Sequence, residues 1–155
     1  MDGSLALTSE MVAIGLDVVD ARQAIRALST LLERCGHVKD SFAEAVLERE
    51  SVFPTGLPTG KIAVAIPHTD SVHVLSSAMA VGVLAHPVKF REMGDPETAL
   101  DVDVVMLLAI QDPKAVVPFL QKVCTILQDQ DLLAHLKAST EAKQVIEILR
   151  IRLEI

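Results

Sequence analysis

The feature that most constrains the fold is the run VDVVMLLAI at residues 102–110, in which one aspartate is the only charged side chain. A run this apolar is typical of a central strand covered on both faces, because a half-exposed strand alternates apolar and polar residues. Residues 11–19, 62–66 (IAVAI) and 78–85 (AMAVGVLA) also favour strands. Since only a short connection separates 62–66 from 78–85, we expect these two to run antiparallel, which gives a mixed sheet.

Helical patterns occupy most of the remaining chain. After Asp20, a plausible N-cap, apolar residues recur with helical spacing as far as Gly36. A second helix is expected over 41–50, a third that becomes regular near Pro118, and two more that close the chain, the last capped by Thr140. The sequence therefore predicts an α/β fold, a three-layer sandwich with a central mixed β-sheet flanked by helices on both faces.

Two stretches are expected to be irregular: the loop 53–61 (FPTGLPTGK) and the turn-rich connection 88–101 (VKFREMGDPETALD). No repeat, low-complexity tract or linker interrupts the chain, so we expect one domain over residues 1–155.

Composition excludes several functions. The net charge is -7 and the only aromatic residues are four phenylalanines, so neither phosphate-backbone binding nor base stacking is expected and nucleic acid is not a predicted partner. Cys35 and Cys124 lie far apart without a C-x-x-C motif, which favours a reducing, cytoplasmic location. The N-terminal residues do not resemble a signal peptide. The longest uncharged stretch, 71–88, would span a bilayer poorly, so no membrane insertion is expected.

The segment IAVAIPHTDSVH at 62–73 presents a histidine at the end of a strand. Pro67 cannot donate to a strand ladder, so pairing ends there and His68 follows at the carboxyl end, where α/β sheets bind ligands. Neutral imidazole is a nucleophile that can accept a phosphoryl group. Candidate donors for the phosphoryl oxygens are Arg49, Thr55, Thr69 and backbone N–H groups near Gly56 and Gly60. No P-loop motif is present, so the phosphoryl group is expected from outside, without a bound nucleotide or other cofactor.

A metal site is the alternative for this segment. His68, Asp70 and His73 are all possible zinc ligands, so a metal-dependent hydrolase is a second hypothesis. The spacing is not H-E-x-x-H and no other ligand cluster stands out, so we favour the nucleophile and expect no metal.

Residues 47–70, LERESVFPTGLPTGKIAVAIPHTD, carry a family resemblance. Arg49-Glu50, Pro54-Thr55 and Ile66-Pro67-His68 match the pattern of the enzyme IIA component of the fructose–mannitol class (type 2) of the bacterial sugar phosphotransferase system. The PTGL loop and the PHTDxxHV continuation are most similar to the galactitol-type branch, and the resemblance covers about residues 5–150.

The resemblance implies a phosphoryl carrier of the phosphoenolpyruvate-dependent system. His68 would accept the phosphoryl group from the phosphocarrier protein HPr and pass it to a cysteine of enzyme IIB for sugar uptake, with galactitol as the sugar that the branch suggests. Arg49 and Thr55 would hold the phosphoryl group, with Thr69, Asp70 and His73 in support. Glu50 is expected to pair locally rather than take part in chemistry.

One departure from the family pattern concerns a second histidine. Mannitol-type relatives carry it just after the last long strand, where this chain reads AIQDPKAVV. His73 or His86 would have to replace it, or the site uses only Arg49 and hydroxyl groups. A non-transport regulator of the same fold, controlled by phosphorylation of His68, is a further hypothesis. Leu57, Val72, Val74 and Leu75 belong to the core, or some of them to a docking surface around His68.

Overall fold

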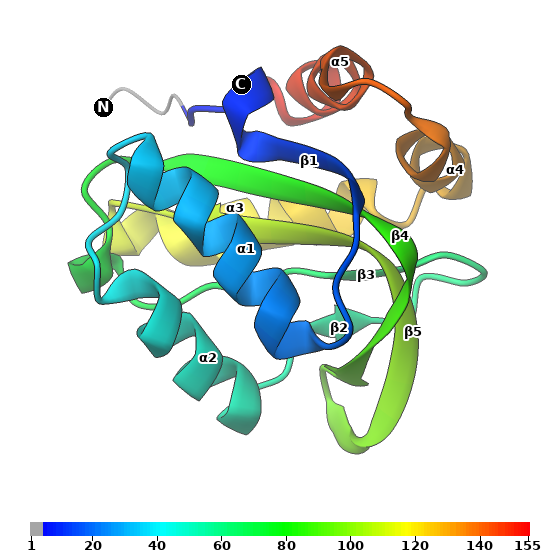
Figure 1. Cartoon of the computed structure of the whole chain (residues 1–155), viewed down its shortest axis with the longest axis horizontal. Helices are drawn as coiled ribbons and strands as arrows, with labels where there is room; N and C mark the ends of the chain where they lie inside the picture. The colour runs from blue at the N-terminus through cyan, green and yellow to red at the C-terminus, as the bar shows by residue number, and fades with distance from the viewer. Residues whose placement is uncertain (1–4) are drawn as a thin grey trace.

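The computed structural model describes residues 5–155, which form a five-stranded sheet with helices on both sides (Figure 1). The N-terminal part contains a 3₁₀ helix (Ser9–Met11), β1 (Val12–Leu16), α1 (Ala21–Arg34), α2 (Phe42–Val52), β2 (Gly56–Leu57), β3 (Ala63–Ala65) and a second 3₁₀ helix (Ser71–His73). The C-terminal part contains β4 (Ala78–Glu92), β5 (Asp95–Ala109), a third 3₁₀ helix (Pro113–Ala115), α3 (Val116–Ile126), α4 (Gln130–Ala138) and α5 (Ala142–Leu153). No helix within 5–155 is long and apolar enough to cross a membrane. The expectation about the chain start falls partly on residues 1–4, outside the described residues.

The sheet is mixed, as the sequence predicts. β1 pairs with β4 in parallel, β4 with β5 antiparallel, β5 with β3 in parallel, and β3 with the short β2 antiparallel. β3 and β4 therefore run in opposite directions as expected, but among the described strands each pairs with β5 and not with the other. The predicted central strand is β5, which lies between them.

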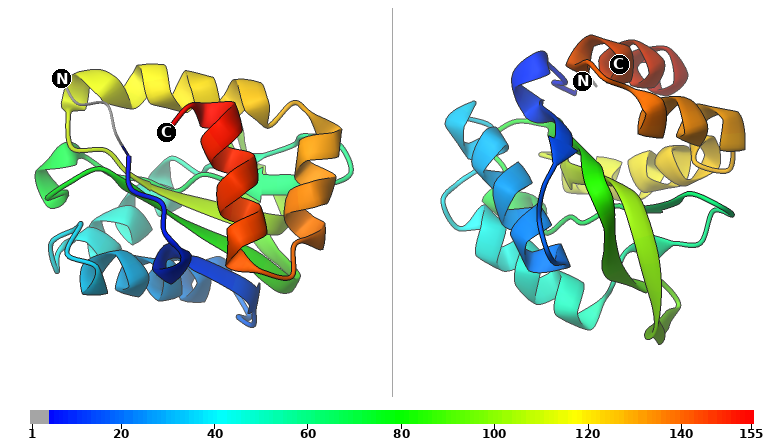
Figure 2. Two further views of the ribbon diagram at one scale, coloured as in Figure 1. Left: turned by 90° about the horizontal axis from the view of Figure 1, so that it is seen from above. Right: turned by 45° about the vertical axis from the view of Figure 1, so that its right-hand side comes forward.

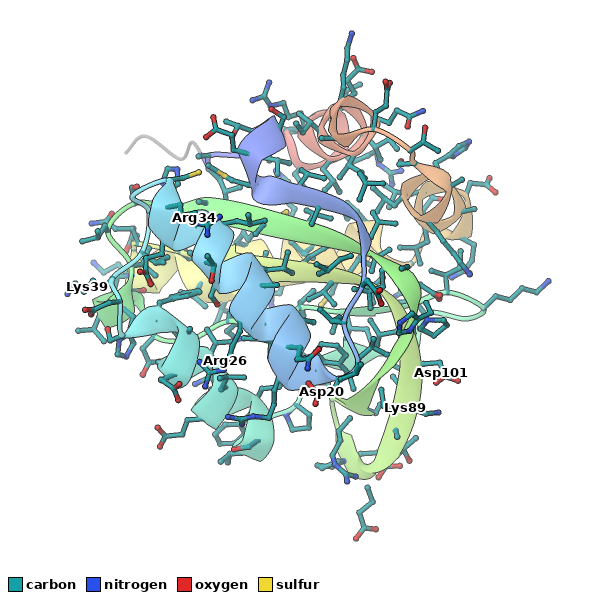
Figure 3. The ribbon with its side chains drawn as sticks, viewed as in Figure 1. Asp20, Arg26, Arg34, Lys39, Lys89 and Asp101 are labelled. Carbon is teal, nitrogen blue, oxygen red and sulfur yellow. The ribbon has the colours of Figure 1, made fainter. Side chains whose placement is uncertain are left out.

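The prediction of an irregular connection at 88–101 is wrong. β4 and β5 continue through it as a long hairpin, and only Met93 and Gly94 form the turn, with Gly94 at a φ of 92° that favours glycine. One glycine and one proline gave the stretch a turn-like composition, which concealed the alternation of buried Val88 and Phe90 with exposed neighbours. Lys89 faces its register partner Asp101 across the hairpin, with Nζ 2.7 Å from Oδ1 (Figure 3).

Two apolar cores separated by the sheet make the three layers (Figure 2). Alternate residues of β5 point to opposite sides: Val105 and Leu107 pack with α1 and α2, while Val104 and Met106 pack with α3, α4 and α5. The predicted three-layer α/β sandwich is thereby confirmed.

Helix ends follow the sequence in part. The Asp20 carboxylate accepts from the Gln23 N–H at 2.8 Å, which confirms the cap of α1. α3 starts at Val116, so Pro118 lies in its first turn, where the missing N–H has no helical partner to lose. The residue that caps α5 is Glu141 rather than Thr140.

Backbone hydrogen bonds continue beyond the end of β3. The Ile66 N–H donates to the Thr55 carbonyl at 3.3 Å, and the Leu108 N–H donates to the Pro67 carbonyl at 3.0 Å. His68 is therefore held beside the end of β5, and the segment after β3 runs toward the side of the molecule where α3 begins (Figure 1). The predicted loop 53–61 contains β2, and a Cβ at Gly56 would lie 2.6 Å from the Arg91 carbonyl oxygen, so only glycine fits there.

Candidate functional site

His68 has a defined tautomer. Its Nδ1 lies 2.8 Å from the backbone carbonyl oxygen of Ile66. A carbonyl only accepts hydrogen bonds, so this contact assigns the proton to Nδ1 and leaves the lone pair on Nε2. The nitrogen next to the main chain is thus occupied, and Nε2 is the nucleophilic atom.

The charge state of His68 suits a nucleophile. Burial lowers the pKa of His68 below the ordinary value of 6.5. The positive charge of Arg49 lowers this pKa further, while the hydrogen bond to Ile66 and the charge of Asp70 act in the opposite direction. Since the net shift is downward, the imidazole is neutral at neutral pH and its Nε2 lone pair is available.

A cavity of about 430 Å³ adjoins His68. Its walls come from the end of α2, from the segment after β3 and from the start of α3. The lining residues are Arg49, His68, Thr69, Asp70, Ser71, Val72, Pro113, Val116 and Val117. The polar lining comes from the first two segments and the apolar lining mostly from the third. A small anionic group seated on His68 would therefore meet donors on one side and apolar side chains on the other.

Arg49 brings positive charge to this cavity from the last turn of α2. Its Nη1 lies 3.8 Å from Asp70 Oδ1, and its guanidinium carbon lies 5.4 Å from the centroid of the Phe53 ring. The Nε atom is buried and forms no hydrogen bond with any residue in the described part of the chain. Arg49 therefore has an unused donor, on a side chain that lines the His68 cavity.

Thr55 and Glu50 lie behind the histidine. The Thr55 N–H and hydroxyl each donate to the Glu50 carboxylate at 2.8 Å, which confirms the expected local pairing of Glu50. Thr55 is buried and is not among the described residues that line the cavity. Its carbonyl accepts from the Ile66 N–H, and the Ile66 carbonyl accepts from His68. A chain of hydrogen bonds thus connects Glu50, through Thr55 and Ile66, to the ring of His68.

The other predicted residues are divided between two cavities. Thr69 and Asp70 line the His68 cavity and also a neighbouring one of about 290 Å³, which His73 lines as well. His73 Nδ1 lies 2.8 Å from the Ser41 hydroxyl. Among residues 5–155 no group of three or more His, Cys, Asp or Glu side chains is placed to hold a metal ion, so the metal hypothesis gains no support.

Neither predicted substitute for the second histidine lines the His68 cavity: His73 lines the neighbouring cavity, and His86 lies far away. His86 Nε2 contacts Asp17 Oδ1 at 3.1 Å. Its position on β4 is eight residues from Ala78, which pairs with Ala109 at the His68 end, a separation of roughly 26 Å at strand spacing. His68 is the one histidine among the described residues that line its cavity.

The sequence reasoning missed Phe53 and Ser71, as well as the apolar lining from the start of α3. Phe53 lies four residues after Arg49, and that helical spacing could have indicated their contact. Ser71 lines the His68 cavity, but nothing in its sequence context distinguishes it from an exposed serine. Of the four apolar residues left open, Val74 is buried and Leu57 packs partly buried against the core, whereas Val72 and Leu75 are exposed.

Comparisons with known proteins show the family of this chain. A family model described as the phosphoenolpyruvate-dependent sugar phosphotransferase system, EIIA 2, matches residues 6–151. The chain belongs to this family. It is therefore an EIIA phosphotransferase component, a phosphoryl carrier of sugar uptake, and the family resemblance of its sequence is confirmed.

Individual relatives of this EIIA chain are distant. The galactitol-specific EIIA component of Escherichia coli strain K12 is 28% identical over 130 residues, which are 84% of this chain and 86% of that protein. The crystal structure of IIA mannitol from Escherichia coli has a TM-score of 0.78 at 23% identity, covering 94% of this chain and 99% of that one. The enzyme IIA in the complex of enzyme IIAMTL with phosphorylated enzyme IIBMTL, from the same organism, has a TM-score of 0.77 at 23% identity, with coverage of 94% and 98%. The two structures establish the shared fold.

Proposed function

We propose that His68 Nε2 accepts the phosphoryl group in this EIIA chain. The observation that carries the proposal is the hydrogen bond from Nδ1 to the Ile66 carbonyl, because it leaves Nε2 unprotonated next to a cavity that also contains Arg49. Arg49 neutralises charge on the phosphoryl oxygens. Thr55, whose hydroxyl donates to Glu50, positions the histidine through the backbone instead of binding the phosphoryl group itself.

The transfer step balances without a cofactor. The bond between phosphorus and the donor atom breaks, and its electron pair returns to the donor. The Nε2 lone pair of His68 forms the new N–P bond, while the Nδ1 proton stays on the ring and remains bonded to the Ile66 carbonyl. In the second transfer a lone pair of the next acceptor attacks the phosphorus, the N–P bond breaks, and its electron pair returns to Nε2. Catalysis here consists of positioning and charge stabilisation.

The partners in this proposal are two proteins. HPr supplies the phosphoryl group and a cysteine of enzyme IIB receives it, which the similarity to an enzyme IIA solved with phosphorylated enzyme IIB supports. Galactitol is the proposed sugar, supported by the galactitol-specific relative. The domain spans residues 1–155 and acts in the cytoplasm.

Phosphoryl transfer with purified components tests the acceptor. Enzyme I, HPr and phosphoenolpyruvate are mixed with the wild type, with His68→Ala and with the matched control His73→Ala. The expected result is one acid-labile phosphoryl group, measured by intact mass, on the wild type and on His73→Ala but not on His68→Ala. A wild type that stays unmodified while the same HPr phosphorylates a known EIIA would contradict the proposal.

A second transfer reaction tests the destination. The phosphorylated chain is mixed with enzyme IIB of a galactitol system and, in parallel, with enzyme IIB of a mannitol system. Faster transfer to the galactitol IIB is expected. Equal transfer to both would remove the support for galactitol, and a stable phosphorylated chain that passes its group to neither would favour the regulator hypothesis.

A further inference from the structure

Two residues that line the His68 cavity each carry a buried donor without a partner. Across residues 5–155, three buried side-chain polar atoms form no hydrogen bond: Ser29 Oγ, Arg49 Nε and Ser71 Oγ. Arg49 and Ser71 both line the cavity that adjoins His68, whereas Ser29 is buried in α1. A buried donor without a partner destabilises the folded state, so native proteins contain few of them. Two of them at one cavity indicate a ligand that accepts hydrogen bonds there.

We propose that Ser71 binds the phosphoryl group, its hydroxyl donating to a phosphoryl oxygen once the group is on His68. The inference rests on the proposed function and adds a residue to the same site. A phosphoryl group on Nε2 presents several anionic oxygens, and Arg49 alone cannot approach all of them. Among the described residues lining the cavity there is no second histidine, and the hydroxyl groups come from Thr69 and Ser71. Of these two, only the Ser71 hydroxyl is buried without a hydrogen-bond partner, so Ser71 is the additional donor that we propose.

The backbone holds Ser71 in place. It opens the 3₁₀ helix Ser71–His73, three positions after the acceptor histidine. The Val74 N–H donates to the Ser71 carbonyl at 2.9 Å, and the His73 N–H donates to the Asp70 carbonyl at 3.3 Å. The backbone around Ser71 is thus held in place before charge arrives on His68, which favours electrostatic stabilisation. The Ser71 proton stays on its oxygen, and Ser71 forms no covalent bond.

Two serine-to-alanine variants test the role. Ser71→Ala and Ser29→Ala each delete a buried hydroxyl without a partner, so neither is expected to lower the melting temperature. Only Ser71→Ala should impair the chemistry. With HPr as donor, its phosphorylation rate should fall at least about tenfold, the phosphoryl equilibrium should shift toward HPr by a similar factor, and the ³¹P resonance of phosphohistidine should move. Ser71→Thr, which keeps a hydroxyl, should retain most of the transfer.

Three outcomes would overturn the inference. One is a Ser71→Ala variant with the rate, equilibrium and ³¹P resonance of the wild type. This result would contradict the role of Ser71 and leave the role of His68 as acceptor intact. Another is a lowered melting temperature with equal loss of transfer in Ser71→Ala and Ser71→Thr, because this pattern indicates a packing role. The last is a wild type that HPr does not phosphorylate at all, which removes the proposed function together with the inference.

Discussion

The pKa of His68 depends on its hydrogen bond to the main chain and on the opposing charges of Arg49 and Asp70, in addition to burial. The pH dependence of phosphoryl transfer should reflect these contributions. The pKa of His68 is lowered, mainly by burial. At pH 6.5, where an ordinary histidine is half protonated, the ring of His68 is therefore mostly neutral. In the unfolded chain the ring binds protons more readily, so its contribution to stability is fully present above pH 6.5. That contribution is lost as the pH falls from 6.5 toward the folded-state pKa.

We therefore expect an NMR titration of His68 to have its midpoint below 6.5, and the transfer rate to fall less between pH 7.5 and pH 6.5 than it would with an ordinary histidine. Two variants should move the midpoint in opposite directions. Arg49→Gln removes a charge that lowers the pKa and should raise the midpoint, whereas Asp70→Asn removes a charge that raises it and should lower the midpoint. Shifts of the reverse sign would mean that these charges do not act on the ring.

Phe53 is exposed, yet it contributes to the site through its ring. The guanidinium of Arg49 lies over the ring, an arrangement that stabilises an exposed cation by about 0.5–1 kcal/mol. Phe53→Ala should therefore slow phosphoryl transfer by about two- to fivefold, with Phe53→Tyr close to the wild type. Ile151→Ala, which removes an exposed apolar side chain from α5, is the control. An equal loss in Phe53→Tyr would point to packing instead of the ring face.

At the scale of elements, the end of α2 and the loop after it act as one support for the histidine. Glu50→Ala would leave the buried Thr55 N–H and hydroxyl without their acceptor, a loss of about 1–3 kcal/mol in the free energy of unfolding. Urea denaturation measures this loss, with Glu33→Ala, an exposed change in α1, as the control. Transfer by the folded fraction should also slow, and an unchanged rate there would show that the hydrogen-bond chain does not position His68.

At this scale, sequence reasoning succeeded where a single residue has a strong local structural preference. Asp20 caps its helix as predicted, and Pro67 precedes a histidine at the end of a strand. The long hairpin was missed because Gly94 and its neighbouring proline suggested a wide connection, when the turn itself needs only two residues. Thr55 was expected in the cavity because a hydroxyl donor suits phosphate, but its partner, Glu50, is set by a turn geometry that the sequence does not reveal.

For the whole molecule, the sheet separates two cores that must unfold together. Leu28 is buried on the side of α1 and α2, and Leu133 on the side of α3, α4 and α5. Each change to alanine should cost about 2–5 kcal/mol, and the double variant should lose the sum to within about 0.5 kcal/mol, because the two sites share no contacts. Urea denaturation followed by two spectroscopic probes checks this, and separate transitions would show that the layers unfold independently.

The overall architecture could be predicted because the apolar run of β5 demands cover on both faces, and the helices supply it. The composition of the site could be predicted only in part. His68, Arg49, Thr69 and Asp70 share a cavity, but the contribution of Pro113, Val116 and Val117 depends on how α3 packs back against the sheet. Such contacts between distant segments are absent from local sequence patterns.

The acceptor for the Nδ1 proton of His68 is a main-chain carbonyl, and this has a consequence for how the protein can evolve. A side-chain acceptor can be lost through a single codon change, whereas every amino acid that replaces Ile66 brings the same carbonyl. A substitution of Ile66 therefore does not change which imidazole nitrogen of His68 is unprotonated. Sequence drift can alter the walls of the cavity, and with them the partners, while the reactive atom stays the same.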